Sequence, residues 1–83
     1  MNLKQERTDI LRASFEQRSR DVMLHQINID NYRLAIAECG PDLADFAAQL
    51  EELLASSIHE QAKERVMLKV IEQQLEADNV RPA

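Results

Sequence analysis

The sequence has very few of the residues that small proteins use for cross-links and for phosphate binding. Its 83 residues include one cysteine, Cys39, one glycine, Gly40, and no tryptophan. One cysteine excludes a disulfide within the chain and favours a reducing compartment. One glycine excludes the loops that cradle nucleotide phosphates, since those loops need several glycines. A chain this short often needs a disulfide, a metal or oligomerisation for stability, and the first of these is ruled out.

Residues for metal binding and catalysis are equally scarce. The only histidines, His25 and His59, belong to no His-Glu-x-x-His motif, and neither follows a glutamate by three residues as in di-iron bundles. Cys39 lies about four helical turns from His25, so we interpret it as a small apolar filler rather than a nucleophile. The sequence therefore predicts no enzymatic activity, no metal and no cofactor, which leaves oligomerisation as the route to stability.

Long apolar segments are also missing. Residues 1–7 include no apolar segment of the signal-peptide type, and no apolar run approaches the length that crosses a membrane. We therefore expect a cytoplasmic protein without a membrane segment.

The dominant pattern in the sequence is a stripe of mainly apolar residues whose spacing alternates between four and three. Its first half is Leu11, Phe15, Arg18, Val22, His25, Ile29, Tyr32, Ile36 and Cys39. After Gly40 and Pro41, its second half is Leu43, Ala47, Leu50, Leu54, Ser57, Gln61, Glu64, Leu68, Ile71 and Leu75. A repeat averaging 3.5 residues is typical of the seam between two supercoiled helices. We therefore predict an all-α fold, an antiparallel helical hairpin that resembles a coiled coil.

The expected hairpin is a single domain, residues 1–83, with helices over about 4–39 and 42–77. Gly40 and Pro41 form the turn, because glycine suits the left-handed position after a helix and proline can begin the next helix. Residues 78–83 are expected to fray, since they offer nothing apolar to dock.

Two segments weaken the expectation of long, continuous helices. Asn28, Asp30 and Asn31 are poor helix formers, and residues 57–60 match a capping box that could start a new helix. Either point could be a helix break, which would give three or four shorter helices. The 3.5-residue repeat runs through both points, so we favour two long helices with a local kink.

Folding the stripe about Gly40 predicts which residues face each other, because facing positions sum to about 82. The predicted seam contains Phe15, Arg18, His25, Tyr32, Leu50, Leu54, Glu64, Leu68 and Ile71. In this register Phe15 faces Leu68, Tyr32 faces Leu50, and Val22 faces Gln61. Arg18 faces Glu64, and such an ion pair can fix the register of two helices.

Large apolar residues away from the seam predict a further interface. They are Met23, Leu24, Ile27, Leu34, Phe46, Leu53, Val66, Met67 and Val70. A lone hairpin cannot cover them, whereas two hairpins packed as a four-helix bundle can. We therefore expect a homodimer. The alternative is that a heterologous protein partner covers the same residues.

The charges are unevenly distributed along the expected hairpin. Residues 21–62 hold eight acids and one base, a net charge of −7, and the other residues hold nine bases and seven acids, a net charge of +2. The hairpin would therefore have an acidic tip and a mildly basic open end. Two explanations fit this pattern. The charges can be those of ordinary helix faces exposed to solvent, or the acidic tip can bind a basic partner.

A nucleic-acid interface is a further alternative at the open end. The bases there are Arg7, Arg12, Arg18, Arg20, Lys63, Arg65 and Lys69. They alternate with acids such as Glu16 and Glu72, so pairs within the helices explain them equally well.

The function that we expect from the sequence is non-enzymatic protein–protein interaction by a helical homodimer, as an adaptor, co-chaperone or inhibitor. The first alternative is nucleic-acid binding through the basic open end. The second is inhibition of a nucleic-acid enzyme by the acidic tip. In size and hairpin form the chain resembles plasmid copy-control RNA-binding hairpins, small co-chaperones of secretion systems and small phage-encoded helical proteins, with which it shares no motif.

Overall fold

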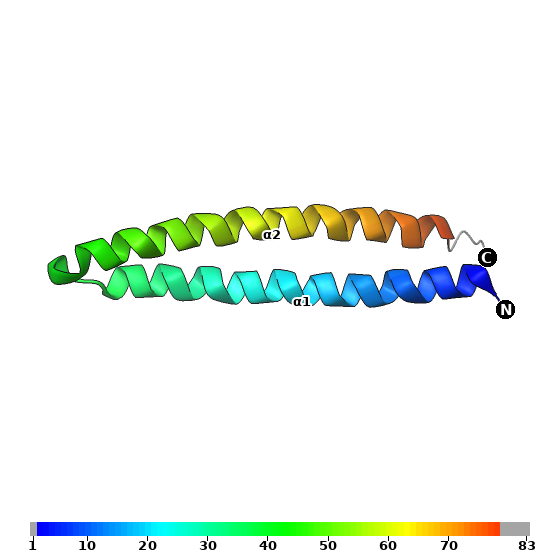
Figure 1. Cartoon of the computed structure of the whole chain (residues 1–83), viewed down its shortest axis with the longest axis horizontal. Helices are drawn as coiled ribbons and strands as arrows, with labels where there is room; N and C mark the ends of the chain where they lie inside the picture. The colour runs from blue at the N-terminus through cyan, green and yellow to red at the C-terminus, as the bar shows by residue number, and fades with distance from the viewer. Residues whose placement is uncertain (1, 79–83) are drawn as a thin grey trace.

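The computed structural model describes residues 2–78, which form two long antiparallel helices joined by a short turn (Figure 1). Helix α1 spans Leu3–Glu38, the 3₁₀ turn η1 spans Pro41–Leu43, and helix α2 spans Ala44–Asp78. The predicted all-α hairpin is therefore confirmed. The second helix ends at Asp78, one residue later than expected, so Asp78 is helical rather than part of the frayed tail. The rest of that expected tail, residues 79–83, lies outside the described residues.

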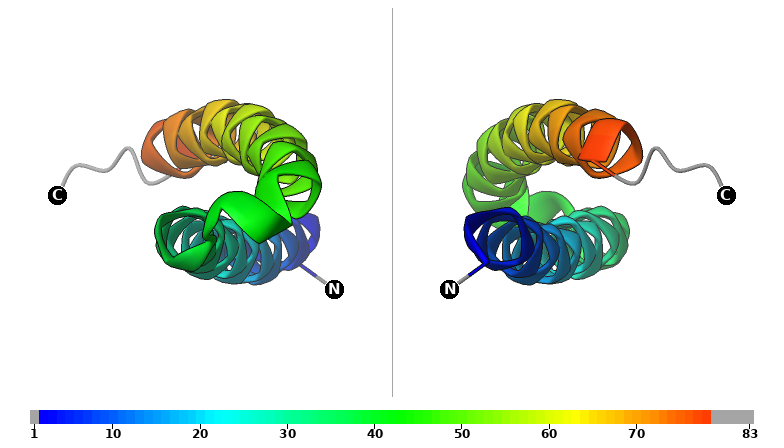
Figure 2. Two further views of the ribbon diagram at one scale, coloured as in Figure 1. Left: turned by 90° about the vertical axis from the view of Figure 1, so that its left-hand side faces the viewer. Right: turned by 90° about the vertical axis from the view of Figure 1, so that its right-hand side faces the viewer.

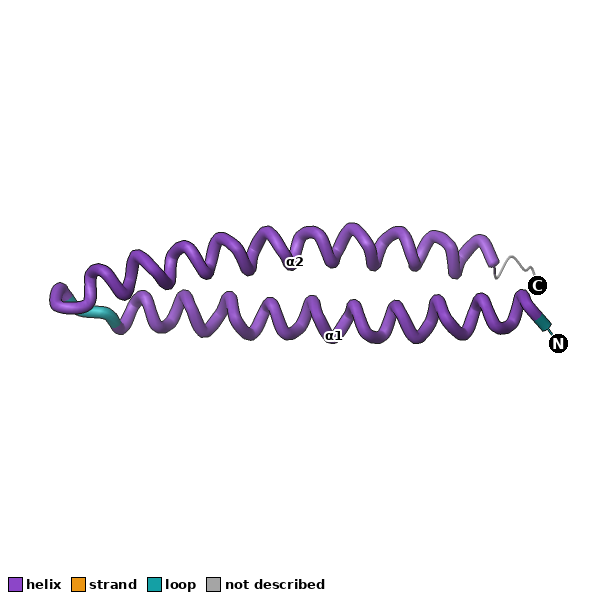
Figure 3. Tube along the Cα trace, viewed as in Figure 1, coloured by secondary structure: helices purple, strands orange, loops and turns teal. Residues whose placement is uncertain are grey.

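Both helices are continuous, so neither weak segment breaks its helix (Figure 3). α1 runs through Asn28, Asp30 and Asn31, and α2 runs through Ser57. Ile29, within the first weak segment, is 2% exposed and is the most deeply buried apolar residue among residues 2–78. Packing of such residues outweighs the low helix propensity of their neighbours.

The ends of the helices have identifiable causes. The side chain of Asn2 caps α1 by accepting a hydrogen bond from the backbone N–H of Gln5 at 3.1 Å. After Glu38 the chain is extended at Cys39 and at Gly40, whose φ is −91°. The expected left-handed conformation of Gly40 is therefore wrong. The residue before a proline is restricted to extended conformations, and Gly40 precedes Pro41.

The two helices make a thin rod that measures 63 × 20 × 16 Å. Viewed from the tip, the pair turns counterclockwise as it recedes, which is the left-handed supercoil expected of a 3.5-residue repeat (Figure 2). The radius of gyration is 18.7 Å, compared with about 12 Å for a compact domain of this length. Ile29, Leu50 and Ile71 are the only buried apolar residues in the described chain. The hairpin alone therefore has a very small core.

Candidate interaction surface

The centre of the seam is polar and holds the two helices in register. Arg18 Nη1 donates to Glu64 Oε1 at 3.0 Å, which is the predicted ion pair. One turn away, Gln61 Nε2 donates to the backbone carbonyl of Val22 at 3.2 Å and to Gln26 Oε1 at 2.9 Å. The contacts of Arg18 with Glu64 and of Gln61 with Val22 join positions that sum to 82 and 83, as the register about Gly40 requires.

The nine residues predicted for the seam all lie in the protected region between the helices. Leu50 and Ile71 are buried, and the other seven are half-buried. The specific contacts of Phe15 with Leu68 and of Tyr32 with Leu50 stay predictions of the same register. Leu43, which continues the stripe in the sequence, is half exposed. It lies in η1, beyond the end of α1 at Glu38, so no residue of α1 lies opposite it.

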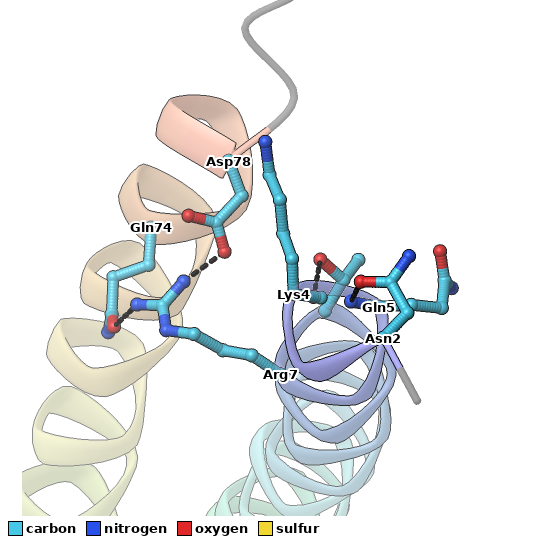
Figure 4. A network of polar contacts seen from close by, with 7 residues as sticks. Asn2, Lys4, Gln5, Arg7, Gln74 and Asp78 are labelled. Carbon is cyan, nitrogen blue, oxygen red and sulfur yellow. Dashed lines mark hydrogen bonds and ion pairs between the residues drawn. The ribbon is translucent and has the colours of Figure 1, made fainter.

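The seam extends further towards the open end than the apolar pattern indicates. Thr8 is buried and donates its hydroxyl to the backbone carbonyl of Lys4 at 3.0 Å. Arg7 reaches from α1 across to α2, where its guanidinium contacts the carboxylate of Asp78 and donates to Gln74 Oε1 at 2.9 Å (Figure 4). Positions 8 and 78 continue the alternating spacing of three and four residues, so the spacing places Thr8 and Asp78 in the seam. The apolar pattern alone misses them because both residues are polar.

The nine residues predicted for the interface are all exposed in the single chain. Their side chains retain between 39% and 67% of their accessible surface. Leu3, Ile10, Leu43 and Ile58 are exposed as well. The chain exposes 6174 Å² in total, whereas a compact monomer of 9.5 kDa exposes about 5,000 Å². The excess is comparable to the roughly 800 Å² that each partner buries in a standard interface.

The exposed apolar residues lie on several sides of the hairpin rather than on one face. Ile27 stands two residues from each of the seam positions 25 and 29. At 100° per residue, it therefore points away from α2. Leu34, two residues from each of the seam positions 32 and 36, shares this outer side of α1. On α2, Phe46, Leu53 and Met67 each precede a seam residue by one position and so flank the seam. We call Ile27 and Leu34 the α1 outer residues.

One pair of charged side chains on α2 shifts the pKa of its carboxylate. Lys63 Nζ lies 3.0 Å from Glu60 Oε1, one turn away on the same helix. The hydrogen bond and the positive charge of Lys63 lower the pKa of Glu60 below its ordinary value of 4.5.

The described part of the chain, residues 2–78, contains no group of three or more His, Cys, Asp or Glu side chains that could hold a metal ion. None of its helices is both long and apolar enough to span a membrane. Comparisons with protein-family models, curated proteins and solved structures find no match to the chain.

Proposed function

We propose that the chain is a non-enzymatic protein–protein interaction module of the cytoplasm, an adaptor, co-chaperone or inhibitor that acts as a helical homodimer. One observation carries this proposal. Thirteen large apolar side chains are exposed on a hairpin that buries only three apolar residues within the described chain. Monomeric soluble proteins rarely expose so much apolar surface, and larger patches mark interaction sites.

The energetics favour self-association of such a surface. Full burial of one large apolar side chain contributes roughly 1.5–3 kcal/mol. Association costs about 4–15 kcal/mol in lost translational and rotational freedom. Partial burial of several of the exposed side chains from each copy can therefore offset this cost.

The ion pairs disfavour nucleic-acid binding at the open end. Arg7, Arg18 and Lys63 each contact a carboxylate of the same chain, so three of the seven bases there are already neutralised locally. Binding to nucleic acid would require these pairs to be broken or shared with phosphate.

A second candidate function has a specific observation in its favour. At the tip, Leu43 and Phe46 are about half exposed beside the exposed carboxylates of Asp42 and Asp45. An apolar knob with an acidic rim is complementary to an apolar groove with a basic rim. In an inhibitor of a nucleic-acid enzyme, the tip would compete with nucleic acid for that groove, and a competition assay would measure this.

Sedimentation equilibrium tests the main proposal. We expect a dimer at micromolar concentration, with helicity by circular dichroism that matches two full-length helices. A fully helical monomer at tens of micromolar would contradict the homodimer. Affinity capture followed by mass spectrometry would then identify which heterologous protein covers the exposed residues.

A further inference from the structure

One side of α2 carries a stripe that complements an antiparallel copy of itself. It lies beside the seam, with alternating spacings of three and four residues. It consists of Phe46, Gln49, Leu53, Ser56, Glu60, Lys63, Met67, Val70, Gln74 and Ala77. We call these ten residues the α2 flank stripe. Its midpoint, between Gln61 and Ala62, falls within one residue of the midpoint of α2 (Ala44–Asp78).

Two copies that run antiparallel about this midpoint bring matching side chains together. Facing positions then sum to 123. The pairs are Phe46 with Ala77, Gln49 with Gln74, Leu53 with Val70, Ser56 with Met67, and Glu60 with Lys63. Each large apolar residue faces an apolar or small one, and each charge faces its opposite. This is the self-complementarity that a twofold interface requires, since every contact occurs twice.

We propose that the homodimer is antiparallel and is joined through the α2 flank stripes of its two copies. The assignment rests on the self-association proposed above, to which it adds the surface and the orientation. Because the midpoints of stripe and helix coincide, the two rods overlap over their whole length.

The centre of the stripe supports a specific register. Glu60 and Lys63 already form an ion pair within one helix at 3.0 Å, and 45% of the Glu60 side chain and 59% of the Lys63 side chain are exposed. At the twofold axis, two such pairs become a ring of four alternating charges. Complementary charges at the edge of an apolar interface fix partner orientation and register in helical pairs.

The charge of the whole rod supports the same orientation. Residues 21–62 carry a net charge of −7, and the other described residues, 2–20 and 63–78, hold eight bases and seven acids, a net charge of +1. Dimers with tips together would place two halves of −7 side by side. The antiparallel dimer instead places each acidic half beside the basic end of its partner. Apolar residues occur along the entire rod and are compatible with either orientation of the two copies. The charges therefore determine the orientation.

Paired substitutions test the surface. Leu53→Asp places a carboxylate inside the proposed interface, and we expect the dimer to weaken by on the order of a hundredfold or more, as for other central apolar contacts. The proposal leaves Ile27, one of the nine residues that the sequence pattern assigns to the interface, outside the dimer contact, because Ile27 points away from α2. Ile27→Asp is therefore the matched control, and its side chain is as exposed in the single chain as that of Leu53. It should leave the dissociation constant unchanged. The reverse result would overturn the assignment to the α2 flank stripe.

A charge swap tests the register. Lys63→Glu alone would gather four carboxylates at the twofold axis and should weaken the dimer about tenfold, because like charges replace two exposed ion pairs. Adding Glu60→Lys restores opposite charges across the axis, and the double variant should regain the affinity of the original chain. A double variant as weak as the single one would overturn this register.

Distance measurement tests the orientation. Spin labels at Ala44→Cys, in a Cys39→Ser background, lie at the tip of each copy. In the antiparallel dimer the two labels are separated by most of the 63 Å length of the rod, and in a dimer with tips together by about its 20 Å width. A short distance in a dimeric sample would overturn the orientation while leaving the homodimer intact. A monomeric sample would overturn both proposals.

Discussion

At the scale of single residues, the alignment of the two helices depends on a few polar side chains in an otherwise apolar seam. Gln61 is buried, and its amide is satisfied by a backbone carbonyl and by Gln26. Glu64 is less well satisfied, because its Oε2 is buried without a hydrogen-bond partner in the described part of the chain. The Arg18–Glu64 pair therefore fixes register at some cost in stability.

Single and double replacements of Arg18 and Glu64 test whether this pair lowers the stability of the fold. We expect Arg18→Leu and Glu64→Leu each to destabilise the protein by about 1–3 kcal/mol, because each leaves a partly buried partner without its hydrogen bond. The double variant should be neutral or stabilised, since the orphaned oxygen of Glu64 is removed as well. Urea unfolding of all four proteins gives the coupling energy. A coupling near zero would mean that the two side chains reach solvent independently.

The Glu60–Lys63 pair predicts a simple pH effect. Lys63→Gln removes the hydrogen bond and charge that lower the pKa of Glu60, so that pKa should rise towards 4.5. A lowered folded pKa stabilises the fold above pH 4.5, and this contribution is lost as the pH falls through the lowered value. NMR titration of the Glu60 carboxyl carbon measures the shift. Lys69→Gln is the control and should leave it unchanged.

At the scale of the elements, burial rather than helix propensity decides where the helices continue. Ile29 and Ile27 offer a matched pair, with the same side chain on opposite sides of α1. We expect Ile29→Ala to cost about 2–5 kcal/mol in the free energy of unfolding, as for other buried apolar truncations. Ile27→Ala should change it by less than about 0.5 kcal/mol. Thermal unfolding at equal protein concentration compares them, and equal effects would contradict the seam geometry.

The helices and their register follow from the sequence because one periodic signal determines both. The 3.5-residue spacing with the break at Gly40 predicts which residues of α1 and α2 are protected, including the Arg18–Glu64 contact. The conformation of the turn does not follow in the same way. The proline after Gly40 overrides the usual role of glycine after a helix, and Leu43 loses its partner because α1 has already ended.

Several polar contacts could not be predicted, and the reasons are also physical. Gln26 lies beside the seam rather than in it, so periodicity does not pair it with Gln61. Arg7 lies outside the stripe, so the spacing that places Asp78 at the seam does not predict that these two charges contact each other. They meet only because two helices of nearly equal length, 36 and 35 residues, bring their far ends together. The side on which each exposed apolar residue lies does follow from the helical repeat, once the seam is known.

At the scale of the whole molecule, the shape of the dimer distinguishes side-by-side association from association through the tips. A dimer whose two rods overlap completely has twice the mass of one rod and nearly the same length. With helices packed about 8–10 Å apart, the radius of gyration should rise only from 18.7 Å to about 19–21 Å. Contact through the tips alone would place the two centres about a rod length apart and raise it above roughly 30 Å. Small-angle X-ray scattering of a sample shown to be dimeric measures this quantity. A large value would mean that the acidic tips, rather than the α2 flank stripes, hold the copies together.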